Sequence, residues 1–279
     1  MLSYKHAYHA GNFADVLKHA ILVNILDYLV IKPGPVCFID THAGAGTYNL
    51  SSAAAQKNRE YEAGISRLWG QPQLPEILER YVGLVRACNP GGSLREYPGS
   101  PEYARRILRA SDQLFLYELH NNEAGQLQNH TRGDRRIHLR REDGFSGCKA
   151  LLPPRQHRGM VLLDPSYEIK TDYRRIADAV QDAWKRFNTG VYMIWYPVVE
   201  RRRIDALERA FKRSTINNIL LLELGIRPDA GTGMGSCGVM VINPPWKLRE
   251  TMMDVLPYLA TLLGVDGQGR YRLEMLATP

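Results

Sequence analysis

Short apolar runs along the chain alternate with segments in which apolar residues recur at helical spacing. Each run is bounded by turn signals, which is typical of a strand buried on both faces of a parallel sheet. Six clear runs span residues 36–39, 114–117, 160–163, 191–195, 219–222 and 239–242. A weaker candidate spans residues 136–139. We therefore expect a sheet of seven strands.

Helical patterns separate these runs. In the first, apolar side chains recur every three or four positions, at Phe13, Val16, Leu17, Ala20, Ile21 and Ile25. Asn12 is predicted to cap this helix, and Pro33-Gly34-Pro35 is predicted to end it. Residues 173–187 and 204–213 carry similar patterns. Strands that alternate with helices predict an α/β fold with a doubly wound, mostly parallel sheet of the Rossmann-like kind.

The composition permits one sizeable core and favours a polyanionic partner. The chain has 279 residues, 44% of them hydrophobic, and a formal net charge of +7. This length fits a single domain over residues 1–279 that contains an insertion. The four cysteines show no C-x-x-C pair or zinc spacing, so we expect reduced thiols and a cytoplasmic location. Residues 1–12 lack the apolar region of a signal peptide, and residues 20–31 are too few to span a bilayer, so no membrane contact is expected.

A glycine-containing turn follows the first strand. It reads Asp40-Thr41-His42-Ala43-Gly44-Ala45-Gly46, and Asn49 stands where dinucleotide-binding loops carry a third glycine. Glycine permits a tight turn and a close approach of the backbone to a ligand. An acidic residue followed by A-G-x-G resembles the first motif of class I methyltransferases, whose loop wraps the amino-acid end of S-adenosylmethionine. An ordinary strand–turn–helix corner is the alternative interpretation.

Two acidic positions follow later strands. A Rossmann-like fold normally places a ribose-binding carboxylate about 20 residues after the loop. The first candidate, Glu118, lies much further along, so residues 51–94, which carry helical patterns, are interpreted as an inserted helical subdomain. Asp143-Gly144 follows the third strand, where the carboxylate is expected to accept a hydrogen bond from the adenine amino group of the cofactor. The alternative for Glu118 is a solvated strand end.

The sequence Asp164-Pro165-Ser166-Tyr167 follows the fourth buried run. It resembles the [D/N/S]-P-P-[Y/F/W] motif of amino-methyltransferases. An exocyclic amine is a poor nucleophile because its lone pair is delocalised into the ring, and an acceptor for each N–H favours an sp3-like nitrogen. We expect Asp164 and the Pro165 carbonyl to be these acceptors and Tyr167 to stack on the extruded base. Ser166 replaces the usual second proline and so removes a conformational restraint on Pro165.

A second sequence fits the same generic pattern better. Asn243-Pro244-Pro245-Trp246 follows the run at residues 239–242. We expect this sequence to follow the last strand of the sheet. In that position it would face away from the cofactor crevice, which is expected at the switch point of the sheet. We therefore interpret it as a structural turn, with contact to the substrate groove as the alternative.

The segment from Tyr4 to His19 reads YKHAYHAGNFADVLKH. Together with residues 40–46, 97–101, 195–199 and 243–248, it closely resembles the RlmJ family of 23S rRNA adenine-N6 methyltransferases. The resemblance covers essentially the whole chain. It implies a Rossmann-like class I methyltransferase that uses S-adenosyl-L-methionine and carries a small helical insertion.

The resemblance also implies roles for individual residues. Asp164 would be the catalytic residue, and Tyr4 and His6 would lie near the substrate base. Cofactor contacts are implied at Lys18, His19, His42, Ser100, Glu118, Asp143, Gly144 and Asp164. From the loop motif itself we add Asp40, Gly44 and Gly46 to the expected cofactor-binding residues. Pro165 and Tyr167 complete the expected substrate-binding set.

The histidines and arginines need separate interpretation. His6, His9, His19 and His42 lack a tight pairing with Cys or Asp, so we expect contacts with cofactor or base and no metal site. Arginines cluster at residues 132–141 and 201–203. We expect Arg135 and Arg136 to contact RNA phosphates, whereas for residues 201–203 a solvated face is equally consistent.

The motifs together with the resemblance imply an enzyme that methylates the N6 amino group of one adenine in 23S rRNA, naked or early in assembly. One alternative keeps the chemistry and changes the substrate to DNA, since RNA and DNA present the same flipped base. Another is a nucleic-acid-binding protein of DNA uptake or catabolism without catalysis. The cofactor loop together with Asp164 argues against that second alternative.

Overall fold

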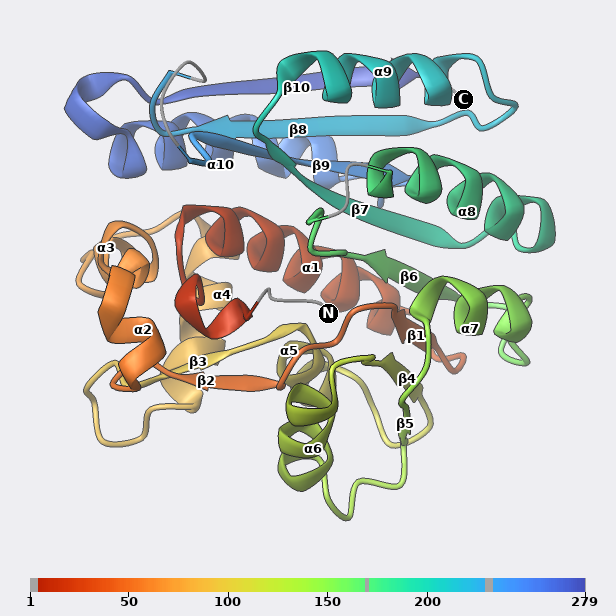
Figure 1. Cartoon of the computed structure of the whole chain (residues 1–279), viewed down its shortest axis with the longest axis horizontal. Coiled ribbons are helices and arrows are strands. Elements are labelled where there is room, and N and C mark those ends of the chain that lie inside the picture. Colours follow the sequence, from red (N-terminus) through yellow and green to blue (C-terminus); the bar gives the residue numbers. More distant parts are fainter. Residues whose placement is uncertain (1–4, 169–170, 229–232, 279) are drawn as a thin grey trace.

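A computed structural model describes residues 5–168, 171–228 and 233–278. It is an α/β fold around an eight-stranded sheet of order β10-β8-β9-β7-β6-β1-β4-β5 (Figure 1). The strands are β1 (Cys37–Asp40), β4 (Gln113–Tyr117), β5 (Ile137–Arg140), β6 (Gly159–Leu163), β7 (Val191–Val198), β8 (Ile219–Gly225), β9 (Ser236–Ile242) and β10 (Arg270–Ala277).

The sheet is mainly parallel, as expected. β1 pairs in parallel with both β4 and β6, and β5 and β7 continue the parallel pairing outward. β9 runs antiparallel to β7 and β8, and β10 runs antiparallel to β8. The strand order reverses at β1, so a crevice is expected outside the carboxyl ends of β1, β4 and β6.

The expected number of seven strands is wrong, because β10 was not recognised. This edge strand reads RYRLEMLA, and most of its residues are half-buried or exposed. It therefore lacks the continuous apolar run that identified the buried strands. Residues 239–242 are also not on the last strand: they belong to β9, which lies between β7 and β8.

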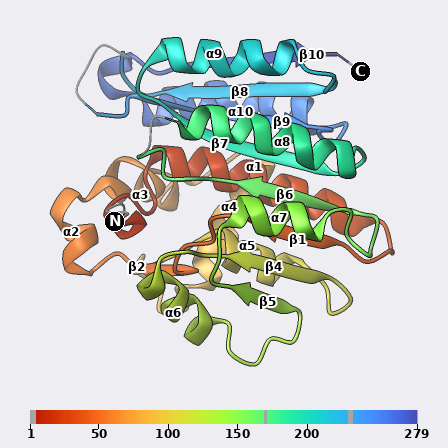
Figure 2. The same ribbon diagram turned by 45° about the vertical axis from the view of Figure 1, so that its right-hand side comes forward.

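Helices cover both faces of the sheet, because successive strand residues point to opposite sides. Phe38 of β1 packs into a cluster with α1 (Phe13–Ile31) and α10 (Leu248–Leu263). Its neighbour Ile39 packs on the other face with α7 (Gly144–Leu151), α8 (Asp172–Arg186) and α9 (Arg201–Lys212). Figure 2 shows α7, α8 and α9 together on one face. The remaining helices of the sheet layers are α5 (Ser100–Ile107) and α6 (Asn121–His130).

The N-terminal cap of α1 is confirmed. Asn12 Oδ1 accepts hydrogen bonds from the backbone N–H groups of Ala14 and Asp15, each at 3.0 Å. Almost every residue of the first four turns of α1 is buried, because the helix lies between the sheet and the helices described next. α1 therefore carries polar side chains such as Lys18 into the interior.

A long segment separates β1 from β4. The short strands β2 (Thr47–Asn49) and β3 (Glu96–Pro98) pair with each other and enclose α2 (Ala53–Asn58), the turn η2 (Glu60–Ala63), α3 (Ile65–Trp69) and α4 (Glu76–Ala87). Leu68 and Tyr81 of this segment belong to the same buried cluster as α1. Short 3₁₀ turns, η1 (His6–Tyr8) and η3 (Val265–Gly267), complete the described elements. Among the described residues, no helix combines the length and apolar character needed to cross a membrane.

Candidate functional site

The loop after β1 has the conformation that its glycines permit. Gly44 has φ +63° and Gly46 has φ +85°, in the left-handed region that other residues rarely adopt. The Gly44 N–H donates to Glu118 Oε2 at 2.8 Å, which joins the ends of β1 and β4. The Gly46 carbonyl accepts from the Gly99 N–H at 2.8 Å, which ties the loop to the start of α5. The loop is therefore a rigid corner over the crevice.

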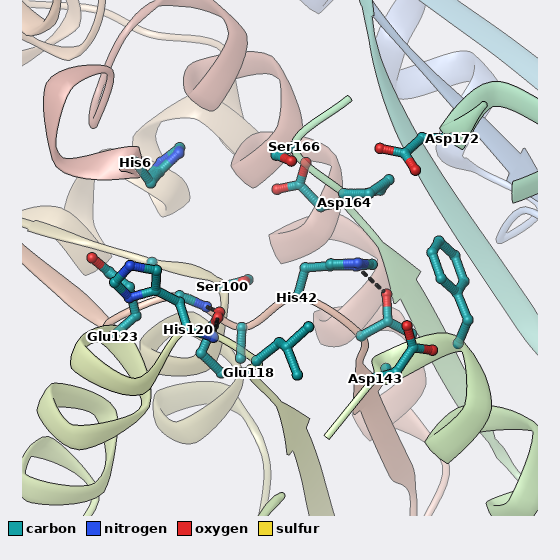
Figure 3. A pocket seen from close by; sticks show the side chains of 18 of the residues that line it. His6, His42, Ser100, Glu118, His120, Glu123, Asp143, Asp164, Ser166 and Asp172 are labelled. Carbon is teal, nitrogen blue, oxygen red and sulfur yellow. Dashed lines mark hydrogen bonds between the residues drawn. The ribbon is translucent and has the colours of Figure 1, made fainter. Parts of the chain in front are cut away.

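A cavity lies beside this loop, at the carboxyl ends of β1, β4 and β6. Its lining includes nine of the expected cofactor residues: Lys18, His19, His42, Gly44, Ser100, Glu118, Asp143, Gly144 and Asp164. Figure 3 shows Glu118, His120 and Glu123 on one side of it and Asp143 on another, with Asp164 and Ser166 across from them. Six carboxylates line the cavity, against two cations, Lys18 and Arg175. They are Glu118, Glu123, Glu142, Asp143, Asp164 and Asp172. In a basic chain, this lining favours a cationic ligand.

Asp40 and Gly46 do not line the cavity but support it from behind. Asp40 is fully buried, and its Oδ2 accepts a hydrogen bond of 2.6 Å from the Ser100 hydroxyl. Burial raises the pKa of the Asp40 carboxyl to about 7. The carboxyl thus holds Ser100 in place at the cavity wall.

The raised pKa of Asp40 makes stability depend on pH in a defined direction. The folded state binds the proton of this carboxyl more tightly than the unfolded chain, whose value is near 3.8. The contribution of the protonated Asp40 carboxyl to the free energy of unfolding is therefore present below about pH 4 and is lost as the pH rises to about 7. We expect the unfolding free energy of the wild type to fall relative to Asp40→Asn across this window, by on the order of 4 kcal/mol, since each pKa unit is worth about 1.4 kcal/mol. Urea titrations at several pH values, without added cofactor, test this; parallel pH profiles would contradict it.

Two histidines present a bare ring nitrogen toward the cavity. The Thr41 hydroxyl donates its proton to the Leu162 carbonyl, so the same hydroxyl must accept from His42 Nδ1–H at 2.8 Å. The His42 proton is therefore on Nδ1, and Nε2 is left as a hydrogen-bond acceptor. Burial lowers the pKa of His42 to about 4, so the ring is neutral. His19 Nδ1 lies 2.7 Å from the Tyr97 hydroxyl, and its pKa is also held well below the usual value by burial. No group of three His, Cys, Asp or Glu side chains in the described residues has the arrangement of a metal site.

The side of the cavity at the end of β4 carries polar atoms that lack a protein partner. Glu118 accepts from the backbone N–H groups of Gly44 and His120, at 2.8 and 2.7 Å, and burial raises the pKa of its carboxyl. In the described structure, His120 Nδ1, Glu123 Oε2 and His19 Nε2 are buried without a hydrogen-bond partner. Buried polar atoms are usually paired, so a polar ligand in this cavity would satisfy them. The hydroxyls and amino groups of S-adenosylmethionine fit such a lining.

Asp143 and Gly144 form the opposite wall. Asp143 caps α7 by accepting from the Ser146 N–H at 2.9 Å, and it also pairs with Arg175. These contacts hold the pKa of the Asp143 carboxyl below its usual range. Gly144 lies so close to the first loop that an added Cβ would be 1.9 Å from the Thr41 carbonyl oxygen. Phe145 adds an apolar surface, with the Arg175 guanidinium 4.6 Å from its ring centroid.

Asp164 lies in a chain of charged groups that begins at the N-terminal segment. Lys18 Nζ lies 2.7 Å from Asp164 Oδ2 and 2.9 Å from Asp15 Oδ1. Asp15 in turn is 2.9 Å from His6 Nε2. Burial raises the pKa of Asp164, while the Lys18 ammonium opposes this rise. Among the described residues, none donates a hydrogen bond to Asp164 Oδ1, so this oxygen is available to a ligand.

A second cavity meets the first at Asp164. It has a volume of about 710 Å³, within the range of ligand sites. The two cavities share His6, Lys18, Asp164 and Ser166. Aromatic residues line the second one beyond Asp164: Tyr167, Tyr173 and Trp195. A small ligand in the first cavity and a planar group in the second would therefore meet beside Asp164.

Tyr167 is anchored in an unusual conformation. Its φ is +54°, which is rare for a bulky residue and is often found at functional sites. Its hydroxyl donates to the Trp195 carbonyl at 2.6 Å, so the ring is held at the edge of the second cavity. Pro165 lines the first cavity, and His6 lines both. Tyr4 lies outside the described residues.

Asn243 lies at the opposite edge of the sheet. β9 is antiparallel to β7, and Ile242 pairs with Tyr192 near the start of that strand. The Asn243 side chain donates to the carbonyls of Asn188 and Gly190, each at 2.8 Å. Neither described cavity that meets at Asp164 includes Asn243 or Trp246. The geometry agrees with a turn-forming role for Asn243.

Several lining residues were not identified from the sequence. Glu123 and Arg175 are polar residues on ordinary helical patterns, His120 directly precedes a helix, and no motif distinguishes the three. Asp15 was detectable in principle, because it stands three positions before Lys18 on the same helix face. Nothing in the sequence pointed to Trp195 as a cavity residue, apart from its place in the segment 195–199 that resembles the family.

The arginine clusters divide into structural and exposed members. Arg136 pairs with Asp134 and donates to the carbonyls of Leu108 and Arg105, so its guanidinium is engaged within the fold. Its contact with RNA stays a prediction. Arg201 is similarly engaged with the buried carboxylate of Glu223. The exposed members of the first cluster are Arg132, Arg135, Arg140 and Arg141. Of these, Arg140 is the last residue of β5 and Arg141 follows it, on the same edge of the sheet as the cavities.

Comparisons with known proteins agree with one another. A family model described as ribosomal RNA large subunit methyltransferase D, RlmJ, matches residues 33–277. The chain is 44% identical over 278 residues to ribosomal RNA large subunit methyltransferase J of Haemophilus influenzae, with 99% of each chain covered. It is 46% identical over 270 residues to the protein of that name in Escherichia coli, with 96% of each covered.

Solved structures give the same picture of the fold. A crystal structure of a Legionella pneumophila protein is 36% identical and matches with a TM-score of 0.90, covering 96% of this chain and 98% of that one. A probable spermidine synthase from Corynebacterium glutamicum is 10% identical, with a TM-score of 0.50, and covers 96% of this chain and 77% of that one. The second likeness concerns the fold alone.

Proposed function

The chain belongs to the family of ribosomal RNA large subunit methyltransferase J, and from this premise we propose that it transfers a methyl group from S-adenosylmethionine to the N6 amino group of one adenine in 23S rRNA. The observation that carries the proposal is the meeting of two cavities at Asp164. The first has a polar, acidic lining suited to a cationic cofactor. The second has aromatic walls suited to a base.

The residues of the first cavity would hold the cofactor in a fixed pose. When bound, S-adenosylmethionine supplies an activated methyl group on a positively charged sulfur. The Glu118 carboxylate is positioned by two backbone N–H groups and would accept hydrogen bonds from ribose hydroxyls. Asp143, Gly144 and Phe145 would bound the cofactor's adenine, and the neutral His42 would offer an acceptor at Nε2.

Asp164 and Pro165 would orient the substrate amine. Asp164 Oδ2 is held by Lys18, which leaves Oδ1 to accept one N6–H. The Pro165 carbonyl would accept the other, so that the nitrogen lone pair points toward the first cavity. Burial raises the pKa of Asp164, which makes Oδ1 a stronger acceptor as the amine loses its proton. Catalysis would then come from positioning and fixed charges.

The substrate base must leave its stack to reach Asp164. Unstacking costs least in a loop, a bulge or an unpaired segment. Such segments are more accessible in protein-free or early assembling rRNA than in a complete subunit. The net charge of +7 favours the RNA backbone as a partner, and rRNA as substrate would place the enzyme in the cytoplasm.

We expect Arg140 and Arg141 to contact RNA phosphates next to the site. Both are exposed, and within the described residues neither forms a salt bridge. Arg141 donates to the neutral Gln128 side chain at 2.7 Å. Replacing both with alanine should raise the Michaelis constant for RNA several-fold and reduce the slope of log affinity against log salt by about 1.4. Filter-binding titrations at several salt concentrations measure this. Cofactor affinity should be unchanged; an unchanged salt slope would remove these residues from the RNA contact.

The substrate class is tested by presenting three nucleic acids in parallel. They are protein-free 23S rRNA that lacks native modifications, assembled large subunits, and duplex DNA rich in adenine. Transfer of labelled methyl to the protein-free rRNA alone is expected. Transfer to duplex DNA without transfer to rRNA would favour a DNA adenine methyltransferase. Tight binding of nucleic acid without transfer to any of them would favour the non-catalytic alternative of DNA uptake or catabolism.

A further inference from the structure

Three loops meet at the edge of the sheet opposite the two cavities. They are the connection from α8 to β7, the connection from α9 to β8, and the turn after β9. The Asn243 side chain donates to Asn188 and Gly190 of the first connection, and its N–H donates to the Asn218 carbonyl of the second, at 3.0 Å. The ends of α8, α9 and β9 lie on the same side of the molecule in both views (Figures 1 and 2).

These segments are strongly basic. They read KRFNTG at residues 185–190, KRSTINN at 212–218 and NPPWKLR at 243–249, and none contains a carboxylate. Six exposed cations are Lys185, Arg186, Lys212, Arg213, Lys247 and Arg249. Within the described part of the chain, none of the six forms a salt bridge. This distinguishes them from the paired arginines 136 and 201.

An exposed aromatic ring stands among these cations. The Trp246 side chain is 71% exposed, which is unusual for tryptophan in a folded chain. Lys247 Nζ lies 4.9 Å from its ring centroid, so a cation and a stacking surface stand together. The turn that carries Trp246 is rigid: Asn243 has φ +52° and two side-chain hydrogen bonds, and two prolines follow it.

We propose that this surface, formed by residues 185–190, 212–218 and 243–249, is a second RNA-binding site that takes an unpaired segment of the substrate RNA. Phosphates would lie on the six cations, and one base would stack on Trp246. Proteins that bind single strands combine these two features, a basic surface and an aromatic platform. The proposal rests on the proposed function for the identity of the RNA. β9 has seven residues, so the surface lies about 23 Å from the cavity edge, at about 3.3 Å per residue, and only a long RNA reaches both.

The test compares two substrates, protein-free 23S rRNA and the shortest fragment of it that the wild type methylates. For Trp246→Ala we expect the Michaelis constant for the long RNA to rise at least about fivefold, since stacking of one base contributes about 1–3 kcal/mol. The turnover number and the kinetics on the short fragment should stay at wild-type values. For Lys185→Ala/Arg186→Ala, the salt slope for the long RNA should fall by about 1.4.

Matched controls separate this effect from general changes of charge or surface. Tyr271→Ala removes another exposed ring, and Arg95→Ala removes an exposed cation on another part of the chain. Both should behave as wild type on both RNAs. If the surface variants match these controls, or lose activity equally on the short fragment, the second site is refuted. If they instead lose binding to vesicles of anionic phospholipid while long-RNA kinetics are unchanged, the surface is a membrane contact and the proposal fails.

Failure of the wild type to methylate either RNA would overturn the proposed function, and with it this proposal. A different result would overturn the second site alone: the wild type methylates both RNAs, and the surface variants have no effect. The two results are distinguishable.

Discussion

Asp164→Ala is expected to lower the single-turnover rate of methyl transfer by on the order of 10²–10³, the usual loss when a preorganised acceptor is removed. Among the described residues, Asp164 is the only carboxylate that the two cavities share, and the variant loses it together with the acceptor for one amine hydrogen. It also leaves Lys18 paired with Asp15 alone. Rapid-quench measurements at saturating RNA and cofactor separate this effect from binding.

Asn243→Ala is the matched control for this variant. Asn243 stands in the sequence that better fits the generic motif, but its side chain holds a turn at the opposite edge of the sheet. We expect lower stability of the fold and a nearly unchanged single-turnover rate. If Asn243→Ala lost the rate and Asp164→Ala kept it, the assignment of the catalytic residue would be reversed.

Gly44→Val is expected to abolish measurable binding of S-adenosylmethionine. At φ +63° a side chain is strained, and an added Cβ would be 2.2 Å from the Tyr48 hydroxyl. That hydroxyl accepts from the Ala45 N–H, so the loop itself must move. The Gly44 N–H that positions Glu118 would move with it. Isothermal titration calorimetry with the cofactor measures the loss directly.

Gly83→Val provides the control for the glycine substitution. Gly83 lies in α4, and a Cβ added there would have no heavy atom within 4 Å. This variant should bind the cofactor with wild-type affinity. Circular dichroism must show a folded Gly44→Val protein for the comparison to hold. Unchanged affinity in folded Gly44→Val would exclude this loop from the cofactor site.

The sequence predicted the buried strands well because each is a continuous apolar run. All six clear runs, and the weaker one at residues 136–139, coincide with strands of the sheet. A strand that is covered on one face only lacks such a run. β10 alternates arginine and glutamate with apolar residues at the sheet edge, so its pattern resembles an exposed segment.

The candidate site was predicted where residues follow strands and missed where they come from helices. Glu118, Asp143 and Asp164 each follow a strand, and the topology of a parallel sheet brings such residues together. Glu123 and Arg175 reach the cavity from helices, and which face of a helix meets a cavity depends on packing. The engagement of Arg136 by Asp134 and two carbonyls likewise depends on tertiary contacts.

The activity proposed for this chain is methylation of the exocyclic amine of an adenine in 23S rRNA. The most direct measurement is nucleoside analysis by mass spectrometry of protein-free 23S rRNA, after incubation with the wild-type protein and isotope-labelled S-adenosylmethionine. We expect one labelled product, N6-methyladenosine, and we expect it to be absent when Asp164→Ala replaces the wild type. Label on a ring nitrogen, on ribose or on another base, or no labelled nucleoside at all, would contradict it.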